Sequence, residues 1–123
     1  MSWHVEITDE AKPELQSLPD DMRPHFLRIA QMLEDFGPQR VRRPHVDHLE
    51  HKLWEIRMHG QDGQSRAIYF AAQGQRLIVV RAFIKKTQKT PRREIEIAYA
   101  RMQGWLQDET QRLSPRRTGQ PRR

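Results

Sequence analysis

Apolar positions near the start of the chain first alternate and then take a helical spacing. Residues 3–7 carry apolar side chains at every second position, which predicts a short strand with one buried face. Ala11, Leu15 and Leu18 follow at helical spacing, which predicts a short helix. Pro13 would interrupt a helix that begins well before it, because proline lacks the amide hydrogen that a helix interior uses.

The next segment has the clearest helical pattern in the chain. Asp20 or Asp21 can cap its start, and Gly37 followed by Pro38 predicts its end. The apolar stripe between these limits consists of Met22, Phe26, Ile29, Leu33 and Phe36. Residues 38–51 have no periodicity, so we expect them to form a loop that faces the substrate.

Three strand-like runs follow in quick succession, at residues 52–59, 65–72 and 76–84. The turns between them contain glycine, and together they predict an antiparallel meander. A last helix is predicted with Thr90 as its cap and Pro91 at its first position.

The element order β-α-α-β-β-β-α predicts an α+β fold, with an antiparallel four-stranded sheet covered on one face by two N-terminal helices and one C-terminal helix. We expect one domain over residues 1–110 and a basic tail over residues 111–123. The last ten residues hold four arginines and no apolar anchor, so we expect the tail to be disordered.

The charge of the chain is unevenly distributed. The net charge is +6, but residues 1–36 carry three basic against eight acidic residues, a net of −5, and residues 37–123 carry nineteen against eight, a net of +11. Arrays of lysine and arginine bind phosphate backbones by releasing condensed counterions, so the basic part predicts a polyanionic partner. Solubility alone would be the other explanation.

The chain has no cysteine, no apolar run long enough to span a membrane and no secretory signal pattern. We therefore expect a cytoplasmic protein without disulfides or membrane contact. His45, His48 and His51 recur at three-residue intervals, but their segment is not evidently helical and no cysteine supports a zinc site. We predict no metal and no cofactor.

The densest run of positive charge lies at residues 81–93, which contain six basic residues and no acidic one. Strict alternation predicts one strand face with Arg81, Phe83 and Lys85, and an opposite face with Ile78, Val80, Ala82 and Ile84. Cations beside an aromatic ring suit RNA, because bases stack on aromatic planes and ammonium groups hold phosphates. The predicted RNA-binding residues are Arg81, Phe83, Lys89, Arg92 and Arg93. A solvated edge beside a helix cap is the alternative.

A second constellation lies on the preceding strands and supplies the parts for RNA cleavage. Arginine can stabilise the negative charge of a phosphorane, and tyrosine, histidine or lysine can move protons to and from the 2′-hydroxyl and the leaving 5′-oxygen. The structural alternative for Arg57 is a cross-strand ion pair. For Tyr69 it is a half-buried position in a strand. The predicted catalytic residues are Arg57, Arg66, Tyr69, Lys85 and Lys86.

Four segments resemble motifs of one known family: Lys52-Leu-Trp-Glu-Ile-Arg57, Arg66-Ala-Ile-Tyr-Phe70, Phe83-Ile-Lys-Lys-Thr-Gln-Lys-Thr-Pro91 and Glu94-Ile-Glu-Ile-Ala98. The chain resembles the RelE/HigB-like toxins of type II toxin-antitoxin systems, in their phage-derived HigB-like branch. The resemblance runs from about Trp3 to Leu106.

The resemblance implies a four-stranded antiparallel sheet flanked by helices and a ribosome-dependent endoribonuclease, an mRNA interferase that inhibits translation. It implies two partners, mRNA on the ribosome and a helix-turn-helix antitoxin, with a heterotetramer of toxin and antitoxin as one assembly. By position, the basic active-site residues of such toxins match Arg57, Arg66, Lys85, Lys86 and Lys89.

The proton-transfer residue stays open in this comparison. Some relatives place a histidine or tyrosine near the C-terminus, where this chain has neither. Tyr69, Tyr99, His59 or a lysine of lowered pKa would then have to serve, and our hypothesis is Tyr69. The surplus of arginine and lysine favours a metal-independent cleavage by the 2′-hydroxyl of the substrate. Two other functions fit the sequence: a non-catalytic ParE-like inhibitor of gyrase and an RNA-binding regulatory domain.

Overall fold

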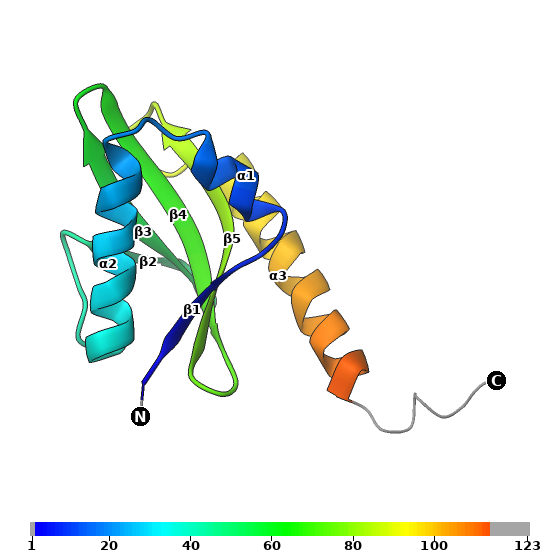
Figure 1. The fold of residues 1–123 in the computed structure, drawn as a ribbon. Helices are drawn as coiled ribbons and strands as arrows, with labels where there is room; N and C mark the ends of the chain where they lie inside the picture. Colours follow the sequence, from blue (N-terminus) through cyan, green and yellow to red (C-terminus); the bar gives the residue numbers. More distant parts are fainter. Residues whose placement is uncertain (1, 114–123) are drawn as a thin grey trace.

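The computed structural model describes residues 2–113 and shows one mixed sheet with three helices (Figure 1). The elements in chain order are β1 (His4–Ile7), α1 (Ala11–Gln16), α2 (Met22–Phe36), β2 (Val46–Glu50), β3 (Leu53–Gly60), β4 (Gly63–Ala72), β5 (Arg76–Lys85) and α3 (Arg92–Leu113). The predicted α+β class is confirmed, as are the first strand, the three helices and the meander.

The sheet has five strands in the order β1-β5-β4-β3-β2. The strands from β2 to β5 pair in antiparallel fashion, whereas β1 runs parallel to β5. The predicted count of four strands and the purely antiparallel pairing are therefore wrong. The additional strand is β2, which lies in the segment that we expected to be a loop. Only Val46 of its five residues is buried, so β2 has no apolar alternation that the sequence could display.

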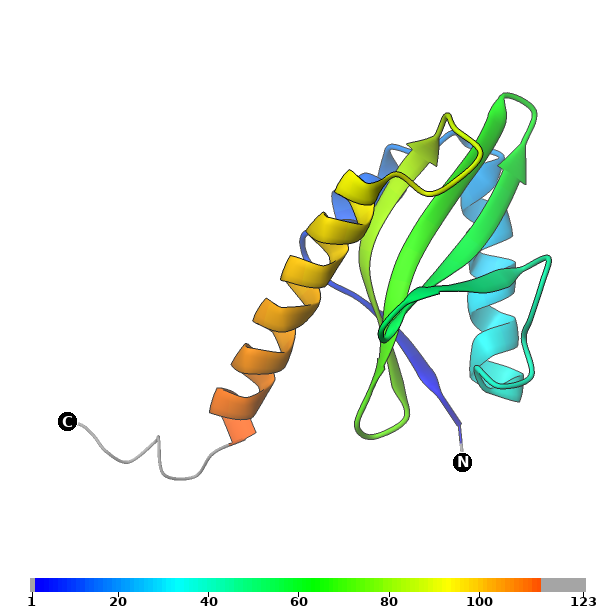
Figure 2. The ribbon, with the colours of Figure 1, turned by 180° about the vertical axis from the view of Figure 1, so that it is seen from behind.

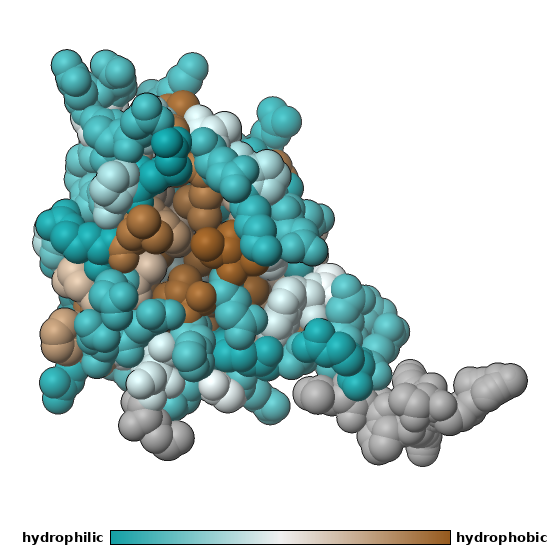
Figure 3. Space-filling model, viewed as in Figure 1, coloured by the Kyte–Doolittle hydropathy of each residue, from teal (hydrophilic) through white to brown (hydrophobic). Residues whose placement is uncertain are grey.

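Helices cover both faces of the sheet, and not one face as predicted (Figures 1 and 2). Side chains of α1 and α2 form one core with one face of the sheet, through Leu15, Phe26 and Ile29 among others. Side chains of α3 form a second core with the opposite face, through Ile95, Ala98 and Met102. Apolar atoms are visible at the centre of the face that carries α1 and α2 (Figure 3). None of the described helices is both long and apolar enough to cross a membrane.

The helix α2 follows its predicted apolar stripe and ends at the predicted glycine. Its buried side chains include Met22, Phe26 and Leu33, which lie on one helical face. Gly37 has a φ of 86° and its amide donates a hydrogen bond of 2.9 Å to the carbonyl of Leu33. A Cβ atom at this glycine would lie 3.3 Å from Nε1 of Trp3, so glycine also lets β1 approach the end of the helix.

A β-bulge in β5 reverses the side-chain alternation that the sequence predicted. Ile68 pairs with Arg81 and Tyr69 pairs with Val79, so Val80 is an extra residue in the strand. Ile78, before the bulge, and Val80, within it, pack in the α3 core, whereas Ala82, beyond the bulge, packs in the opposite core. The predicted common face of Val80 and Ala82 is therefore wrong.

Glu14 connects α1 to β5 and α3. Its carboxylate accepts hydrogen bonds of 2.6 Å from Arg81, 3.0 Å from Arg101 and 3.1 Å from the amide of Ala82. Pro13, just before it, lies in the first turn of the helix, where a missing amide hydrogen costs no intrahelical bond. The carboxylate of Glu14, with its three donors, thus fixes the short helix α1 together with the buried side chains of Ala11 and Leu15.

The C-terminal helix extends beyond the predicted domain limit. α3 runs to Leu113, so residues 111–113 are helical and do not belong to a tail. The rest of the predicted tail, residues 114–123, lies outside the described residues.

We predict that Glu14→Gln lowers the free energy of unfolding by about 2 kcal/mol at neutral pH, the usual size of a hydrogen bond to a charged group. Burial alone would raise the pKa of Glu14, but the hydrogen bonds and charges of Arg101, Ala82 and Arg81 outweigh it and lower the pKa below 4.5. The stabilisation is complete above about pH 4.5 and is lost as the pH falls through the lowered pKa. Urea denaturation across this range should show a weaker acid dependence in Glu14→Gln. An equal dependence in both proteins would contradict this role.

Candidate functional site

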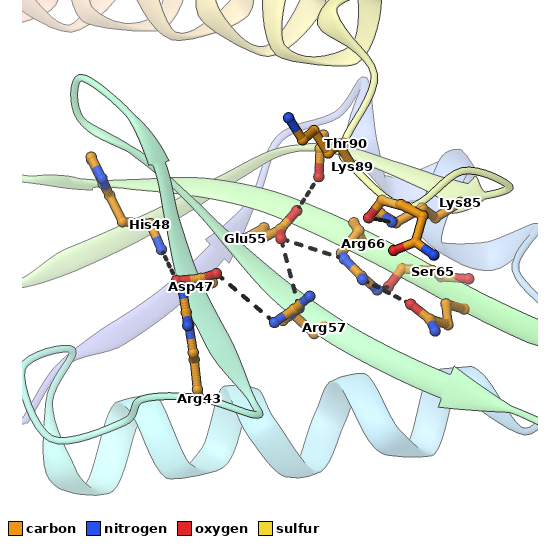
Figure 4. A network of polar contacts seen from close by, with 12 residues as sticks. Arg43, Asp47, His48, Glu55, Arg57, Ser65, Arg66, Lys85, Lys89 and Thr90 are labelled. Atoms are coloured by element: carbon orange, nitrogen blue, oxygen red, sulfur yellow. Dashed lines mark hydrogen bonds and ion pairs between the residues drawn. The ribbon is translucent and has the colours of Figure 1, made fainter.

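Three cationic side chains meet on the sheet face that also carries α3. Arg57 of β3 and Arg66 of β4 are direct cross-strand partners, and Lys85 ends β5 nearby. Figure 2 shows α3 beside β5 on this face, whereas β3 and the neighbouring part of β4 are open toward the viewer. Together with Glu55 of β3 these residues form what we call the basic site (Figure 4).

Glu55 is the anionic centre of the basic site. Its side chain is only 5% exposed, and its Oε2 atom lies 3.4 Å from Nε of Arg66 and 3.8 Å from Nε of Arg57. Its Oε1 atom accepts a hydrogen bond of 2.6 Å from the hydroxyl of Thr90, just before α3. One carboxylate therefore holds two guanidinium groups and the loop that follows β5.

Sequence reasoning missed Glu55 as a site residue. The available signal was an acidic residue at a strand position that faces the same side as Leu53 and Arg57. A charged residue inside a strand is rarely buried without a partner, so its position already favoured an ion pair. The sequence could not show which of the many basic residues would be that partner.

Arg66 is almost completely buried, with 1% of its side chain exposed. Its Nη1 donates to the carbonyl of Ser65 at 3.0 Å and its Nη2 donates to Oε1 of Gln64 at 2.8 Å. Its Nε faces Glu55 at ion-pair distance but makes no hydrogen bond within the described residues. Burial lowers the pKa of Arg66, Glu55 opposes this shift, and Arg57 adds to it. The buried guanidinium thus adds positive potential to the site.

Arg57 is more accessible than Arg66, with 29% of its side chain exposed. Its Nη1 lies 3.8 Å from Oδ2 of Asp47 on β2, and Oδ1 of the same carboxylate lies 3.1 Å from Nε of Arg43. Burial alone would raise the pKa of Asp47, but Arg43, the amide of His48 and Arg57 lower it overall. Asp47 therefore remains ionised and orients Arg57 from the β2 side.

Lys85 is buried beneath the loop that joins β5 to α3. Its ammonium group donates hydrogen bonds to the backbone carbonyls of Thr87 and Gln88. Burial lowers the pKa of Lys85, the charges of Arg66 and Arg57 lower it further, and Glu55 opposes them. This lysine both shapes the loop and gives up its proton more easily than an exposed lysine.

The remaining predicted cations lie around this loop. Lys86, Lys89 and Arg93 are exposed, and Arg92 is exposed and paired with Glu50 of β2. Free ammonium groups at the rim and a guanidinium at the floor are suited to hold an extended phosphate backbone.

The hairpin between β3 and β4 is fastened to the start of α2. The amide of His59 donates to Nδ1 of His25 at 3.0 Å, and the amide of Gln61 donates to Oδ2 of Asp21 at 2.6 Å. A Cβ atom at Gly60 would lie 2.7 Å from the same carboxylate, so a larger residue there would displace Asp21. Burial, Arg66, His25 and Arg57 lower the pKa of His59. The hydrogen bonds to His25 and Asp21 fix the strand ends that carry Arg57 and Arg66.

Three predicted residues do not join the basic site. Tyr69 lies on the opposite face of the sheet, in the core with α1 and α2, and burial raises the pKa of its phenol. Its position follows from its odd separation from Arg66 in one strand, which the sequence already contained. Its assignment as the proton-transfer residue of the basic site is therefore corrected.

Phe83 and Arg81 also have structural surroundings. Phe83 is 8% exposed and packs in the core beneath α3, so its ring is not available for base stacking. Arg81 forms ion pairs of 2.6 Å with Glu14 and with Glu94, which raise the pKa of its guanidinium against the effect of burial. Phe83 packs against α3, and Arg81 ties both α1 and α3 to the sheet. The prediction that these two residues contact RNA is therefore corrected.

The three regularly spaced histidines do not converge. Nε2 of His48 lies 2.8 Å from the carbonyl of His51, and the ring of His51 lies beside Tyr99 of α3. Across residues 2–113, no three His, Cys, Asp or Glu side chains form a group that could hold a metal ion.

A family model with the description "Phage derived protein Gp49-like (DUF891)" matches residues 13–103. The chain belongs to this family. The Gp49-like proteins are RelE/HigB-like toxins, so the resemblance seen in the sequence is confirmed. The matched range contains the whole basic site and the loop before α3.

Solved structures place the Gp49-like chain in the RelE fold. A structure described as the archaeal RelE-RelB complex from Pyrococcus horikoshii OT3 matches it with a TM-score of 0.51 and 24% sequence identity. The match covers 68% of this chain and 96% of the archaeal chain. At this identity the likeness establishes the fold alone. A search of curated protein sequences finds no match.

We predict that Glu55→Gln lowers the free energy of unfolding by about 3 kcal/mol, because it leaves the buried guanidinium of Arg66 without its carboxylate. The amide can still accept the hydrogen bond from Thr90, so the decrease reports the ion pairs. Urea denaturation measures it, with the exposed Glu96→Gln as the matched control. Equal stability of the two variants would show that Glu55 does not hold the site together.

Proposed function

We propose that this Gp49-like protein is a ribosome-dependent endoribonuclease that cuts mRNA and inhibits translation. The observation that carries the proposal is the convergence of Arg57, Arg66 and Lys85 around Glu55, beside a lysine-rich loop, with Arg57 partly exposed. The four cations Arg43, Arg57, Arg66 and Lys85 outnumber the carboxylates of Glu55 and Asp47, which leaves a net positive region for a phosphate group. Membership of a toxin family supports this assignment.

The proposed reaction uses the 2′-hydroxyl of the substrate as the nucleophile. Its oxygen attacks the adjacent phosphorus, a base removes its proton, and the bond from phosphorus to the 5′-oxygen breaks as that oxygen receives a proton. The guanidinium of Arg57 contacts the phosphorane oxygens, while buried Arg66 adds positive potential and Glu55 keeps both guanidiniums in place. The products are a 2′,3′-cyclic phosphate and a 5′-hydroxyl.

Lys85 is the proposed general acid for the leaving 5′-oxygen. A lysine acts as an acid near neutral pH only when its pKa lies below the ordinary value, and burial and Arg66 produce such a shift here. The two carbonyl groups of the loop fix the direction of its ammonium group. Lys86 and Lys89 bind the flanking phosphates.

We further propose a cytoplasmic toxin that an antitoxin neutralises. The similar archaeal RelE is described in complex with RelB. A helix-turn-helix antitoxin encoded beside this gene, in a heterotetramer with it, is the corresponding partner here.

We predict that transcripts cut in translating extracts carry 5′-hydroxyl ends and 2′,3′-cyclic or 3′-phosphate ends. Arg57→Ala should abolish both the cuts and the growth arrest, whereas Arg28→Ala, an exposed change on α2, should preserve both. End mapping of the transcripts is the measurement. Ends with a 5′-phosphate would refute the mechanism, and uncut RNA with stalled replication would favour the ParE-like gyrase inhibitor. Intact RNA that is still bound would favour a regulatory RNA-binding domain.

A second prediction separates acid catalysis from charge at Lys85. Lys85→Arg keeps a cation at every accessible pH but removes the proton donor, so cleavage should fall by about 10² to 10⁴-fold. Binding of an uncleavable 2′-O-methyl RNA should be retained. In the unchanged protein, the single-turnover rate should decline as the pH rises through the lowered pKa of Lys85, below 10.5. An active Lys85→Arg with the same pH profile would assign the acid to another residue.

A further inference from the structure

A groove of about 680 Å³ lies beside the β2 edge of the sheet, and none of the four residues of the basic site lines it. Its walls come from Trp3 just before β1, the segment after α2, and strands β2, β3 and β4. Apolar side chains form most of its floor, and the residues used below are Trp3, Arg42, Arg43, Asp47, His48 and Trp54. The function proposed above does not use this groove.

Two aromatic rings stand in contact in one wall of the groove. His48 of β2 and Trp54 of β3 are cross-strand partners, and their ring centroids are 4.8 Å apart. Trp54 is 37% exposed, which is unusual for the largest apolar side chain in a sheet with two cores. Trp3 lines the same groove. Exposed indole faces in a concave site provide stacking surfaces for a planar ligand.

The rim of the groove is positively charged. Arg42 and Arg43 are both exposed, and 75% of the side chain of Arg43 remains accessible although it pairs with Asp47. An aromatic wall with guanidinium groups at the rim of the groove matches a nucleotide, in which a flat base is attached to an anionic phosphate.

Asp47 makes the groove continuous with the basic site. Its carboxylate lines the groove, holds Arg43 at 3.1 Å and lies 3.8 Å from Arg57 (Figure 4). Because β2 is an edge strand of the sheet, an RNA chain bound at Arg57 can pass around this edge to Arg43.

We propose that the groove binds one nucleotide of single-stranded RNA adjacent to the segment in the basic site, with its base on Trp54 and its phosphate at Arg42 and Arg43. The groove would then contribute to the base preference of cleavage. This inference rests on the proposed function for its substrate, but RNA binding can be tested without cleavage.

The test uses a short 2′-O-methyl RNA of mixed sequence, which cannot supply a 2′-hydroxyl nucleophile. Trp54→Leu should weaken its binding by roughly 5- to 150-fold, the effect of removing the stacking of one base. Trp54→Phe should restore part of the affinity, because phenylalanine keeps an aromatic face and leucine does not. A merely structural role for Trp54 would make the two variants equal in RNA affinity, and that result would overturn the proposal.

Intrinsic fluorescence identifies the groove directly. In a Trp105→Phe background the indoles of Trp3 and Trp54 remain, and RNA should quench them. Trp105 belongs to α3, packs against Phe70 and Arg76 and does not line the groove, so Trp105→Phe alone should leave RNA affinity unchanged. The double variant Arg42→Gln with Arg43→Gln should reduce the slope of log affinity against log salt by about 0.7 for each phosphate that the arginines no longer bind.

The outcomes separate this inference from the proposed function. Quenching and Trp54-dependent binding without any cleavage on ribosomes would sustain the groove and refute the nuclease. Cleavage with unchanged sites and rates in Trp54→Leu, together with unquenched indoles, would refute the groove and sustain the nuclease. Quenching by a purified antitoxin but not by RNA would identify the groove as a protein-docking surface, and the proposal would be wrong.

Discussion

The basic site depends on one buried ion-pair arrangement, in which the carboxylate of Glu55 lies between Arg57 and Arg66. Two guanidinium groups on directly paired strand positions repel each other, and burial removes the water that would screen them. The carboxylate of Glu55 on the same face offsets part of this repulsion. The positive potential that remains is what a phosphate group would meet, so the same arrangement that permits folding also prepares the site for an anion.

The surrounding fold serves to hold this charge cluster at an open end of the sheet. Thr90, just before α3, donates a hydrogen bond to Glu55. Lys85 holds the loop between β5 and α3 by donating to two of its backbone carbonyls. On the other face, α2 holds the β3–β4 hairpin through His25 and Asp21. Helices on opposite faces thus fix the strand ends that carry the two arginines, although neither helix contributes a cation to the site itself.

The β2 strand gives the site a second side. Its Asp47 orients Arg57 on one face, while its His48 packs at a tilt against Trp54 and lines the groove on the other. Side chains of adjacent residues in a strand point to opposite faces, so a single short edge strand can contact an RNA chain as it passes around the edge. The cleavage site and a neighbouring nucleotide site would then share one structural element, with Asp47 as the residue common to both.

The sequence by itself determined the class of fold, the three helices, most of the strands and the region of positive charge, because helical spacing, strand alternation and charge are local properties of the chain. It also determined that Tyr69 and Arg66 face opposite sides, since that follows from their spacing in one strand. Only the tertiary structure decided the rest. The strand β2 has no alternating apolar pattern, because its two apolar residues, Val46 and Leu49, are three positions apart, and it forms through pairing with β3. The bulge at Val80 reverses the faces of β5. Which acids neutralise which arginines depends on contacts between residues far apart in the chain. Arg81 is tied to Glu14 and Glu94. Arg57 and Arg66 share Glu55, and Arg57 also shares Asp47 with Arg43, so that with Lys85 the cations of this region outnumber its two carboxylates.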